Sequence, residues 1–519
     1  MPQRLPTGQP LPLYSVAQTR AIEHAAAASL PPHTLMQRAG LAVARLALAL
    51  APHARTLWIA CGPGNNGGDG LEAAMHLRQW GMHPIVTWLG DETALPGDAR
   101  ASLHRARAAG VAFASAPPAL SEHDLCIDAL LGIGATRAPQ DAMAAWLAHM
   151  AGSRAACLAV DLPSGLNADT GQQPGAAPMP AGTAPRHTLS LLTLKPGLFT
   201  AHGRDACGTL WFDPLGVALP PVPPTAWLNT PAPPALRPHA SHKGSFGDVA
   251  IIGGEHTRHH HASSDHDSPC AMTGAALLAA RAALHGGAGR VYVSLLGGST
   301  ALDAQAPELM FRPAPALALP SLTVVCGCGG GQAVHAVLPA VLAQAARAVL
   351  DADALNAIAH DPGLQAALTA RTTRGQPTVL TPHPLEAARL LACPAAQVQA
   401  DRLAAASALA QRFQCTVVLK GSGTVIAAPG QVPRINPTGC ARLATAGTGD
   451  VLAGLLGAYL AASPASGPDA QRGTLPPSPP SAAFTAACQA VWQHGATADG
   501  WPPGQSLTAS ALAKRLGAV

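Results

Sequence analysis

The chain contains the stretch Thr445-Ala446-Gly447-Thr448-Gly449-Asp450-Val451-Leu452-Ala453-Gly454, in which a glycine-rich loop leads into an apolar segment that ends at Leu460. The two loop glycines allow a tight turn and a close approach of a ligand to the backbone. The apolar segment predicts a helix, and its N-terminal amide groups would attract an anion. Asp450 would repel a bare phosphate, so this carboxylate favours a base that removes a proton from a hydroxyl during phosphoryl transfer. The alternative interpretation is a helix cap.

Upstream of this stretch, short apolar segments alternate with Ala- and Leu-rich segments. Strands are expected near 248–252, 290–296, 323–326, 348–351, 377–381 and 415–420. This alternation predicts a mostly parallel sheet with helices on both faces. Polar or glycine-rich loops follow several of these strands, at 327–331, 351–356, 381–386 and 420–424. Each loop alone could be a cap, a turn or a surface segment. Together they indicate a site, because ligands bind at the carboxyl ends of parallel strands.

The first half contains a second strand–loop–helix unit. The apolar strand 56–61 precedes the loop 62–70, and the segment 71–80 predicts a helix. The loop matches the G-x-G-x-x-G dinucleotide fingerprint, with Asp91 as a candidate ribose ligand. Its side-chain oxygens suit a cation, a ribose or a nicotinamide amide better than a pyrophosphate. The alternative is a loop of turn-forming residues in which Asp69 caps the helix.

Two further strands of the first half also end in polar residues. The strand 124–131 carries Asp128 and precedes the loop 132–137, and the strand 156–161 ends at Asp161. Two Ala-rich helices are expected before them, between residues 15 and 50. Three oxygen-rich strand ends in one parallel sheet predict a ligand site.

The composition indicates a globular protein of two or three domains. The chain has 519 residues, of which 48% are hydrophobic and 3% aromatic. Its net charge of +4 without a dense basic tract gives no basis for nucleic-acid binding. The eleven cysteines are scattered, which is typical of a reducing cytoplasm. Neither a signal peptide nor a membrane span is expected.

Proline content divides the chain into two domains. Nine prolines between residues 213 and 244 predict a semi-rigid linker. We therefore expect domains at 1–222 and 241–519, joined by residues 223–240. A histidine-rich insert at 256–267 could bind a metal, but its spacing favours an exposed loop. Residues 463–481 predict a second loop insertion.

Four motifs of the first half identify a family. Asn65 to Asp69, the segment from Asp128 to Gly134, Val160 to Gly165, and Leu194 to Gly197 resemble the YjeF N-terminal domain, an NAD(P)H-hydrate epimerase. The resemblance implies a Rossmann-like three-layer α/β/α sandwich. It also implies a potassium ion bound by Asn66, Asp128 and Ser164. The hydrated nucleotide would contact the following residues: Asn65, Asn66, Gly67, Gly68, Asp69, Gly132, Ile133, Gly134, Ala135, Thr136, Arg137, Ala138 and Asp161.

The second half resembles the ribokinase-like YjeF C-terminal domain, the ADP-dependent NAD(P)H-hydrate dehydratase. The resemblance lies in 242–247, 274–276, 351–356, 381–383, 420–421 and 447–450. It implies contacts of the hydrated substrate with Ala275, Gly329, His383 and Asp450. The adenine nucleotide would contact Lys420, Gly421, Ser422, Gly423, Thr424 and Gly449. The chain departs from the family at Cys328, where proline is usual, and at Leu385, where glycine is usual.

The chemistry of the hydrate gives each domain a catalytic residue. At carbon 6 of the nicotinamide ring, the ring nitrogen can expel the hydroxyl, and water can return from either face; we expect Asp161 to be the acid/base. In the second domain, phosphorylation of the same hydroxyl by ADP would make it a good leaving group, with Asp450 as the base. The resemblance further implies magnesium with ADP, the substrates NADHX and NADPHX, and a homo-oligomer. It leaves no role for nucleic acid or membrane.

Two alternatives come from other functional classes. One is a small-molecule kinase of the same fold, which the fused epimerase-like half disfavours. The other is a binding module, because domains similar to the first half serve as scaffolds in RNA decapping. The intact loop 65–69, together with Asp161, favours catalysis instead.

Overall fold

The computed structural model divides the chain into two compact units, residues 1–227 and 228–519. It describes residues 1–6, 8–135, 137–173, 184–219, 221–232, 238–259, 268–298, 302–464 and 481–517. Thr136, most of the histidine-rich insert and most of the insert at 463–481 lie outside these ranges. The expected linker contains β10 (Ala226–Leu228), which pairs antiparallel with β2 (Pro12–Leu13).

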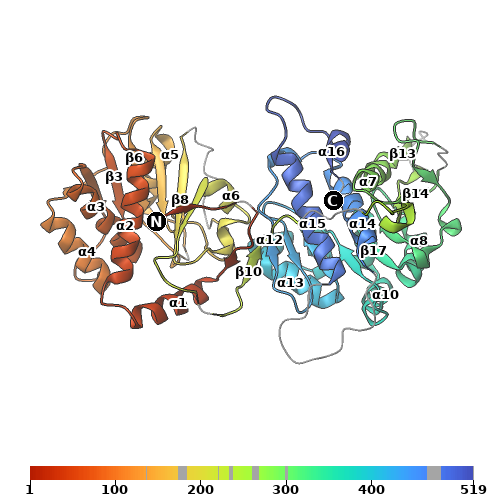
Figure 1. The fold of residues 1–519 in the computed structure, drawn as a ribbon, viewed down its shortest axis with the longest axis horizontal. Coiled ribbons are helices and arrows are strands. Elements are labelled where there is room, and N and C mark those ends of the chain that lie inside the picture. The colour runs from red at the N-terminus through yellow and green to blue at the C-terminus, as the bar shows by residue number, and fades with distance from the viewer. Residues whose placement is uncertain are drawn as a thin grey trace. The chain divides into compact units, whose positions relative to one another are not determined.

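The first unit is built on a mostly parallel sheet (Figure 1). Its strand order is β1 (Gln3–Arg4), β9 (Thr209–Asp213), β8 (Arg186–Leu191), β7 (Ala156–Val160), β6 (Leu125–Ala129), β3 (Leu57–Cys61), β4 (Pro84–Trp88) and β5 (Ala112–Ala114). β1 pairs antiparallel with β9, and the other neighbours pair in parallel. The strands expected at 56–61, 124–131 and 156–161 are therefore confirmed, each within two residues of its expected ends.

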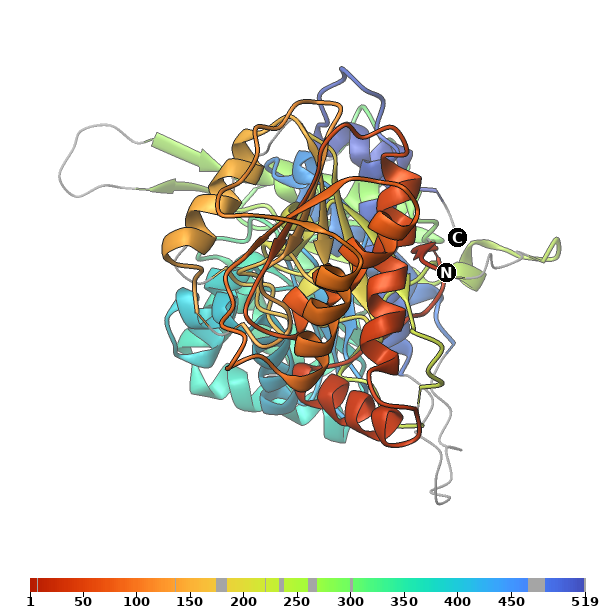
Figure 2. The same cartoon turned by 90° about the vertical axis from the view of Figure 1, so that its left-hand side faces the viewer.

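Helices cover both faces of this sheet. The helices are α1 (Val16–Ala28), α2 (Thr34–Leu50), α3 (Asn65–Gln79), α4 (Gly97–Ala108), α5 (Asp141–Gly152) and α6 (Gly203–Ala206), with a 3-10 turn η1 (Pro196–Leu198). Alternate residues of β3 enter two different cores: Leu57 and Ile59 pack with α2 to α4, whereas Trp58 and Ala60 pack with α5. The two expected Ala-rich helices are α1 and α2, seen in red in Figure 2.

The boundary of α3 corrects the sequence prediction. Residues 65–70 were expected in a loop, but the helix begins at Asn65. The reason is close packing: a Cβ atom on Gly67 would lie 2.0 Å from the backbone oxygen of Gly62. A Cβ atom on Gly68 would lie 2.8 Å from Met36 Cε. Tertiary contacts thus override the low helix propensity of these residues.

The second unit has a longer mostly parallel sheet. Its order is β15 (Met310–Phe311), β14 (Arg290–Leu295), β11 (Asp248–Gly253), β16 (Thr323–Cys326), β17 (Arg347–Leu350), β18 (Thr378–Leu380), β19 (Thr416–Leu419), β20 (Val425–Ala427) and β21 (Arg434–Ile435). β20 pairs antiparallel with both of its neighbours in this list. The six strands expected from sequence are confirmed. A short hairpin is formed by β12 (His256–His259) and β13 (Ser268–Ala271).

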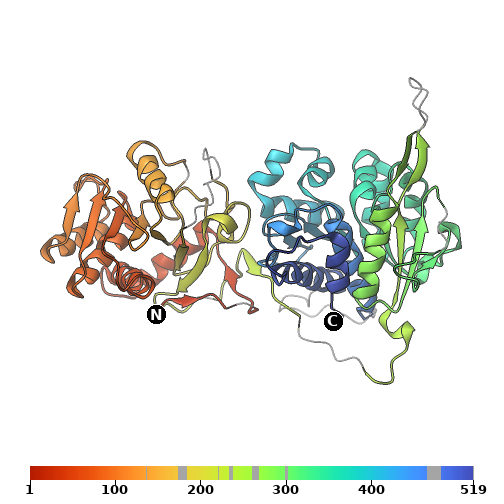
Figure 3. The ribbon, with the colours of Figure 1, turned by 90° about the horizontal axis from the view of Figure 1, so that it is seen from above.

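The helices of the second unit lie on both sides of its sheet (Figure 3). One core contains α7 (Thr273–His285), α14 (Thr448–Ala462), α15 (Ala482–Asp499) and α16 (Ala509–Arg515). The other contains α8 (Val334–Gln344), α9 (Ala352–His360), α10 (Pro362–Thr373), α11 (Pro384–Leu391), α12 (Ala395–Ala400) and α13 (Arg402–Phe413). Short 3-10 turns are η2 (Lys243–Phe246), η3 (Ala314–Ala316), η4 (Leu319–Ser321) and η5 (Ala441–Leu443). The expected two-domain α/β architecture is confirmed. None of the helices in the described ranges has the length and apolarity needed to cross a bilayer.

Candidate functional site

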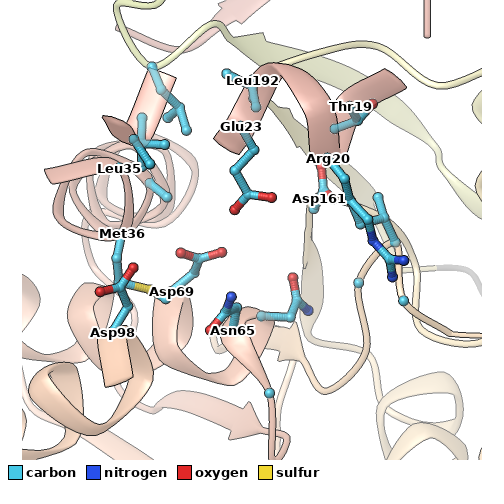
Figure 4. A pocket seen from close by; sticks show the side chains of 18 of the residues that line it. Thr19, Arg20, Glu23, Leu35, Met36, Asn65, Asp69, Asp98, Asp161 and Leu192 are labelled. Carbon is cyan, nitrogen blue, oxygen red and sulfur yellow. The ribbon is translucent and has the colours of Figure 1, made fainter. Parts of the chain in front are cut away.

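A cavity of about 600 Å³ opens at the carboxyl ends of strands in the first unit (Figure 4). Its walls combine residues from α1, α2, the start of α3 and the loops after β6 and β7. The volume falls in the range of small-molecule and cofactor sites. The cavity brings together these residues predicted from sequence: Asn65, Asn66, Asp69, Gly132, Ile133, Gly134, Ala135 and Asp161.

Asp161 is fixed in this cavity by a buried ion pair. The residue directly follows β7 and has a φ of 65°, a left-handed conformation that is uncommon outside glycine and often occurs at functional sites. Its Oδ1 accepts hydrogen bonds from the Lys195 ammonium and from the Leu191 amide, the latter at 3.0 Å. Lys195 is fully buried and also donates to the Leu191 carbonyl at 2.9 Å. The carboxylate therefore has one orientation.

Two more carboxyl groups face the same space. Glu23 on α1 and Asp69 on α3 point toward one another across the cavity (Figure 4). Burial raises the pKa of Asp69 well above its usual value, and the nearby Asp161 and Glu23 raise it further. Burial also raises the pKa of Glu23, with Asp161 adding to the effect. The cavity thus favours protonated carboxyl groups close to a fixed ion pair.

The amide of Asn66 is available to a ligand. The residue is 9% exposed and lines the cavity, and its Nδ2 atom is buried without a hydrogen-bond partner among the described residues. A buried donor without a partner is unfavourable, so a bound polar group would satisfy it. Gly67 and Gly68 lie deeper in α3 and serve helix packing.

The loop after β6 forms another wall. Gly132 to Ala135 line the cavity, whereas Arg137 and Ala138 are not among its lining residues. A Cβ atom on Gly134 would lie 3.5 Å from Arg20 Nη2, so this arginine of α1 lies against the loop. An exposed guanidinium beside a loop that can approach a ligand closely suits a negatively charged group.

Asp128 and Ser164 form a polar pair behind this loop. The Ser164 hydroxyl donates to Asp128 Oδ1 at 2.6 Å, and the Ser164 amide donates to Oδ2 at 2.9 Å. Burial raises the pKa of Asp128 even though these hydrogen bonds oppose the shift. A Cβ atom on Gly132 would lie 3.1 Å from Asn66 Oδ1, which places the amide oxygen at the same loop.

Several lining residues were missed by sequence reasoning. These are Thr19, Arg20, Glu23, His33, Leu35, Met36 and Asp98. His33 has a φ of 67° and its Nδ1 lies 2.5 Å from Asp98 Oδ1. The spacing of Thr19 and Glu23 places them on one helix face, but nothing in that pattern indicates that the face meets a ligand. Lys195 lies in a quoted motif, yet its pairing with Asp161 needs the tertiary structure.

The second unit collects charged residues at the carboxyl ends of β16 to β19. Lys420 Nζ lies 2.7 Å from Asp351 Oδ1 and 3.9 Å from Glu386 Oε2. Burial alone would lower the pKa of Lys420, but the two carboxylates outweigh it and the pKa is raised. Burial raises the pKa of Glu386 to about 7. A Cβ atom on Gly449 would lie 3.5 Å from Lys420 Nζ, so α14 begins beside this cluster.

Asp450 lies in the first turn of α14 rather than in a loop before it. The helix begins at Thr448, and Gly447 occupies the cap position with a φ of 87° and no capping side chain. Burial raises the pKa of Asp450 to about 7, and Asp351 adds to the shift. A base poised near neutral pH beside uncapped amide groups can remove a proton next to a bound phosphate.

Cys328 is one of the two departures from the family pattern, and it lies beside the candidate base Asp450. Its thiol is fully buried and hydrogen-bonds to the Asp450 carboxyl. Burial raises the pKa of this thiol well above its usual value, and Asp450 and Asp351 raise it further. The thiol is therefore a neutral donor to Asp450.

The remaining predicted residues lie at the same strand ends, except Ala275, which lies in the first turn of α7. His383 caps α11: the Leu385 amide donates to its Nδ1 at 3.1 Å, and its Nε2 lies 3.2 Å from Glu386 Oε1. Leu385 is exposed, so the missing glycine leaves this cap intact. A Cβ atom on Gly329 would lie 2.9 Å from Ala275 Cβ. Residues 421–424 form the turn between β19 and β20, directly after Lys420.

Comparisons with known proteins found matches to both halves of the chain. A family model described as YjeF-related protein N-terminus matches residues 32–197, and one described as NAD(P)H-hydrate dehydratase matches residues 270–517. The chain is 35% identical to the bifunctional NAD(P)H-hydrate repair enzyme Nnr of Escherichia coli K12, over 90% of this chain and 85% of that protein.

Two further matches were found in other organisms. The Nnr enzyme of Coxiella burnetii is 33% identical over 86% of this chain and 90% of that protein. The solved ADP/ATP-dependent NAD(P)H-hydrate dehydratase of Bacillus subtilis, co-crystallised with ATP/Mg2+, is 28% identical, with a TM-score of 0.41, over 56% of this chain and 92% of that chain.

Proposed function

The chain belongs to the family of bifunctional NAD(P)H-hydrate repair enzymes, and from that premise we propose where each of its two reactions takes place. The enzyme epimerises NAD(P)H hydrate and dehydrates it to NAD(P)H at the expense of ADP. We assign epimerisation to residues 1–222 and dehydration to residues 241–519, with 223–240 as their connection. The carboxyl groups and free amide of the first cavity support the first assignment, and the lysine–carboxylate cluster beside α14 supports the second.

In the epimerase site, Asp161 acts as the acid/base at carbon 6. Its carboxyl donates a proton to the leaving hydroxyl, the ring nitrogen forms a double bond to carbon 6, and water departs. Water then adds to carbon 6 and returns a proton to the Asp161 carboxylate. Lys195 holds Asp161 in place during these transfers. Asn66 Nδ2 is free to orient the carboxamide of the substrate.

Replacement of Asp161 tests this assignment. In Asp161→Asn we expect interconversion of the R and S hydrates to fall about a hundredfold. Dehydration of the S hydrate by the second unit should stay unchanged, and circular dichroism of the variant reports whether the first unit is folded. Epimerisation near the wild-type rate would show that a group other than Asp161 is the acid/base.

The potassium ion implied by the family fits the donor set. Asn66, Asp128 and Ser164 offer an amide, a carboxylate and a hydroxyl oxygen, which are hard ligands suited to such a cation. They would hold it behind the loop after β6, where its charge would offset the nearby carboxylates. An epimerase rate that increases with KCl but not with choline chloride, with a weaker response in Asp128→Asn, would support this site.

In the dehydratase site, Asp450 takes the proton of the carbon 6 hydroxyl. The hydroxyl oxygen of the substrate then attacks the β-phosphorus of ADP, and AMP is released. The phosphate ester then departs as inorganic phosphate, and loss of a ring proton restores the double bond of the reduced nicotinamide. Lys420, residues 421–424 and Gly449 would hold the nucleotide, and Ala275, Gly329 and His383 would face the hydrate. Magnesium would accompany ADP, because it neutralises phosphate charge.

Replacement of Asp450 tests the second assignment. In Asp450→Ala we expect the affinity for ADP to be kept and dehydration to fall about a hundredfold or more. Epimerisation by the first unit should stay unchanged, and the retained affinity for ADP reports that the second unit is folded. Recovery of reduced-nicotinamide absorbance with ADP and with ATP in parallel also determines which nucleotide is used.

We also propose a compartment and an assembly state. We propose the cytoplasm as the compartment, because eleven scattered cysteines suit a reducing environment. A homo-oligomer, implied by the family resemblance, is also proposed, and light scattering of the purified chain tests it.

A further inference from the structure

The epimerase cavity contains a carboxyl group without an assigned role. Glu23 projects from α1 into the cavity and takes no hydrogen-bond partner from the described part of the chain. It faces Asp69, whereas Asp161 enters from the end of β7 (Figure 4). The same wall contains the buried Asn66 Nδ2, which has no hydrogen-bond partner among the described residues.

The reaction itself requires proton transfer on two sides of one ring. The hydroxyl of one epimer lies above the nicotinamide plane and that of the other lies below it. Asp161 cannot move between the faces, because Lys195 and the Leu191 amide hold its Oδ1. A second carboxyl group on another wall removes this difficulty.

We propose that Glu23 is a second catalytic acid/base of the epimerase, acting on the ring face opposite to the one that Asp161 serves. This inference rests on the proposed epimerase site. The longer side chain of Glu23 is not fixed by a hydrogen bond, so it can follow the hydroxyl as the ring becomes planar. Asp69, directly across from it, is placed to exchange a proton with it.

Each inversion moves one proton from Glu23 to the leaving water and one proton from the incoming water to Asp161. Glu23 donates its proton to the hydroxyl on its face; the carbon–oxygen bond breaks, water leaves, and the ring nitrogen forms a double bond to carbon 6. A water molecule then adds from the other face and gives a proton to the Asp161 carboxylate. The reverse inversion returns both groups to their starting states, and exchange with solvent through Asp69 has the same result.

The electrostatics of the cavity agree with these roles. Burial raises the pKa of Glu23, and Asp161 raises it further, so the proton needed for donation is held more tightly. Lys195 and Arg20 act in the opposite direction. Asp98 also raises the pKa of Glu23, and Glu23 and Asp69 interact as like charges.

Oxygen exchange from ¹⁸O-labelled water separates the two faces. We expect Glu23→Gln to lower R/S interconversion about a hundredfold, while it keeps ¹⁸O incorporation into one epimer and loses it in the other. Asp161→Asn should keep ¹⁸O incorporation into the epimer that loses it in Glu23→Gln, and lose it in the other. His24→Gln, at the exposed neighbouring position of α1, is the matched control and should behave as wild type.

The outcomes are distinguishable. Equal loss of exchange into both epimers in Glu23→Gln would indicate a structural role and overturn the proposal, as would wild-type interconversion. Oxygen exchange that is kept into one epimer reports that the cavity of the first unit is folded in each variant. If the wild-type chain neither exchanged oxygen nor interconverted the epimers, the proposed epimerase site itself would fail.

Discussion

Removal of the Cys328 thiol should shift the pH dependence of dehydration. Asp450 must be ionised to accept a proton, so activity is lost as pH falls through its pKa of about 7, raised first by burial and then by Asp351. The hydrogen bond from Cys328 stabilises the carboxylate and lowers this pKa. In Cys328→Ala the carboxylate loses that donor, so its pKa increases and the acidic limb moves to higher pH.

The size of the shift follows from the strength of the hydrogen bond. A thiol is a weak donor, and about 0.5–1 kcal/mol for this bond corresponds to roughly 0.4–0.7 pKa units. At pH 7 the ionised fraction of Asp450 would fall from about one half to about one fifth. We therefore expect kcat/KM to drop roughly two- to threefold at pH 7 and to be unchanged well above the pKa.

The assay follows reduced-nicotinamide absorbance from the S hydrate at saturating ADP, between about pH 5.5 and 9.5. Cys326→Ala is the matched control, because Cys326 is equally buried but packs in the core on the other sheet face. An acidic limb that stays in place or moves to lower pH in Cys328→Ala would refute the reasoning. Burial also raises the pKa of Glu386 to about 7. If Glu386→Gln abolished the acidic limb, that limb would report the ionisation of Glu386 instead of Asp450.

Two further predictions concern the stability of the first unit. Lys195→Met leaves the Asp161 carboxylate without its buried partner, so urea unfolding should show a loss of about 3–5 kcal/mol, and an unchanged midpoint would contradict the importance of the pair. Gly67→Ala places a Cβ atom 2.0 Å from the Gly62 backbone oxygen and should lower the unfolding free energy by about 1–3 kcal/mol or more. Gly64→Ala, with nothing within 4 Å of the added atom, is its control in thermal unfolding and should differ little from wild type.

The sequence determined the α/β class and the strand ends that carry chemistry. Asp161 and Lys420 directly follow strands whose apolar runs are visible locally, and parallel strands place such residues at one edge. Glycine motifs and the alternation of strands with helices depend on residues that are close in the chain, so they can be recognised as patterns in the sequence. The resemblance to hydrate repair enzymes rested on those same motifs, and the comparisons bear it out.

Only the tertiary structure decided which distant side chains meet. Asp161 pairs with Lys195, 34 positions along the chain, and Glu23 of α1 lines the same cavity as the loops after β6 and β7. The start of α3 at Asn65 also depends on packing against Gly62 and Met36, against the local propensity for a loop. Such contacts join segments whose separation in the chain carries no periodic signal, so pairing, burial and the resulting pKa shifts exist only once the chain has folded.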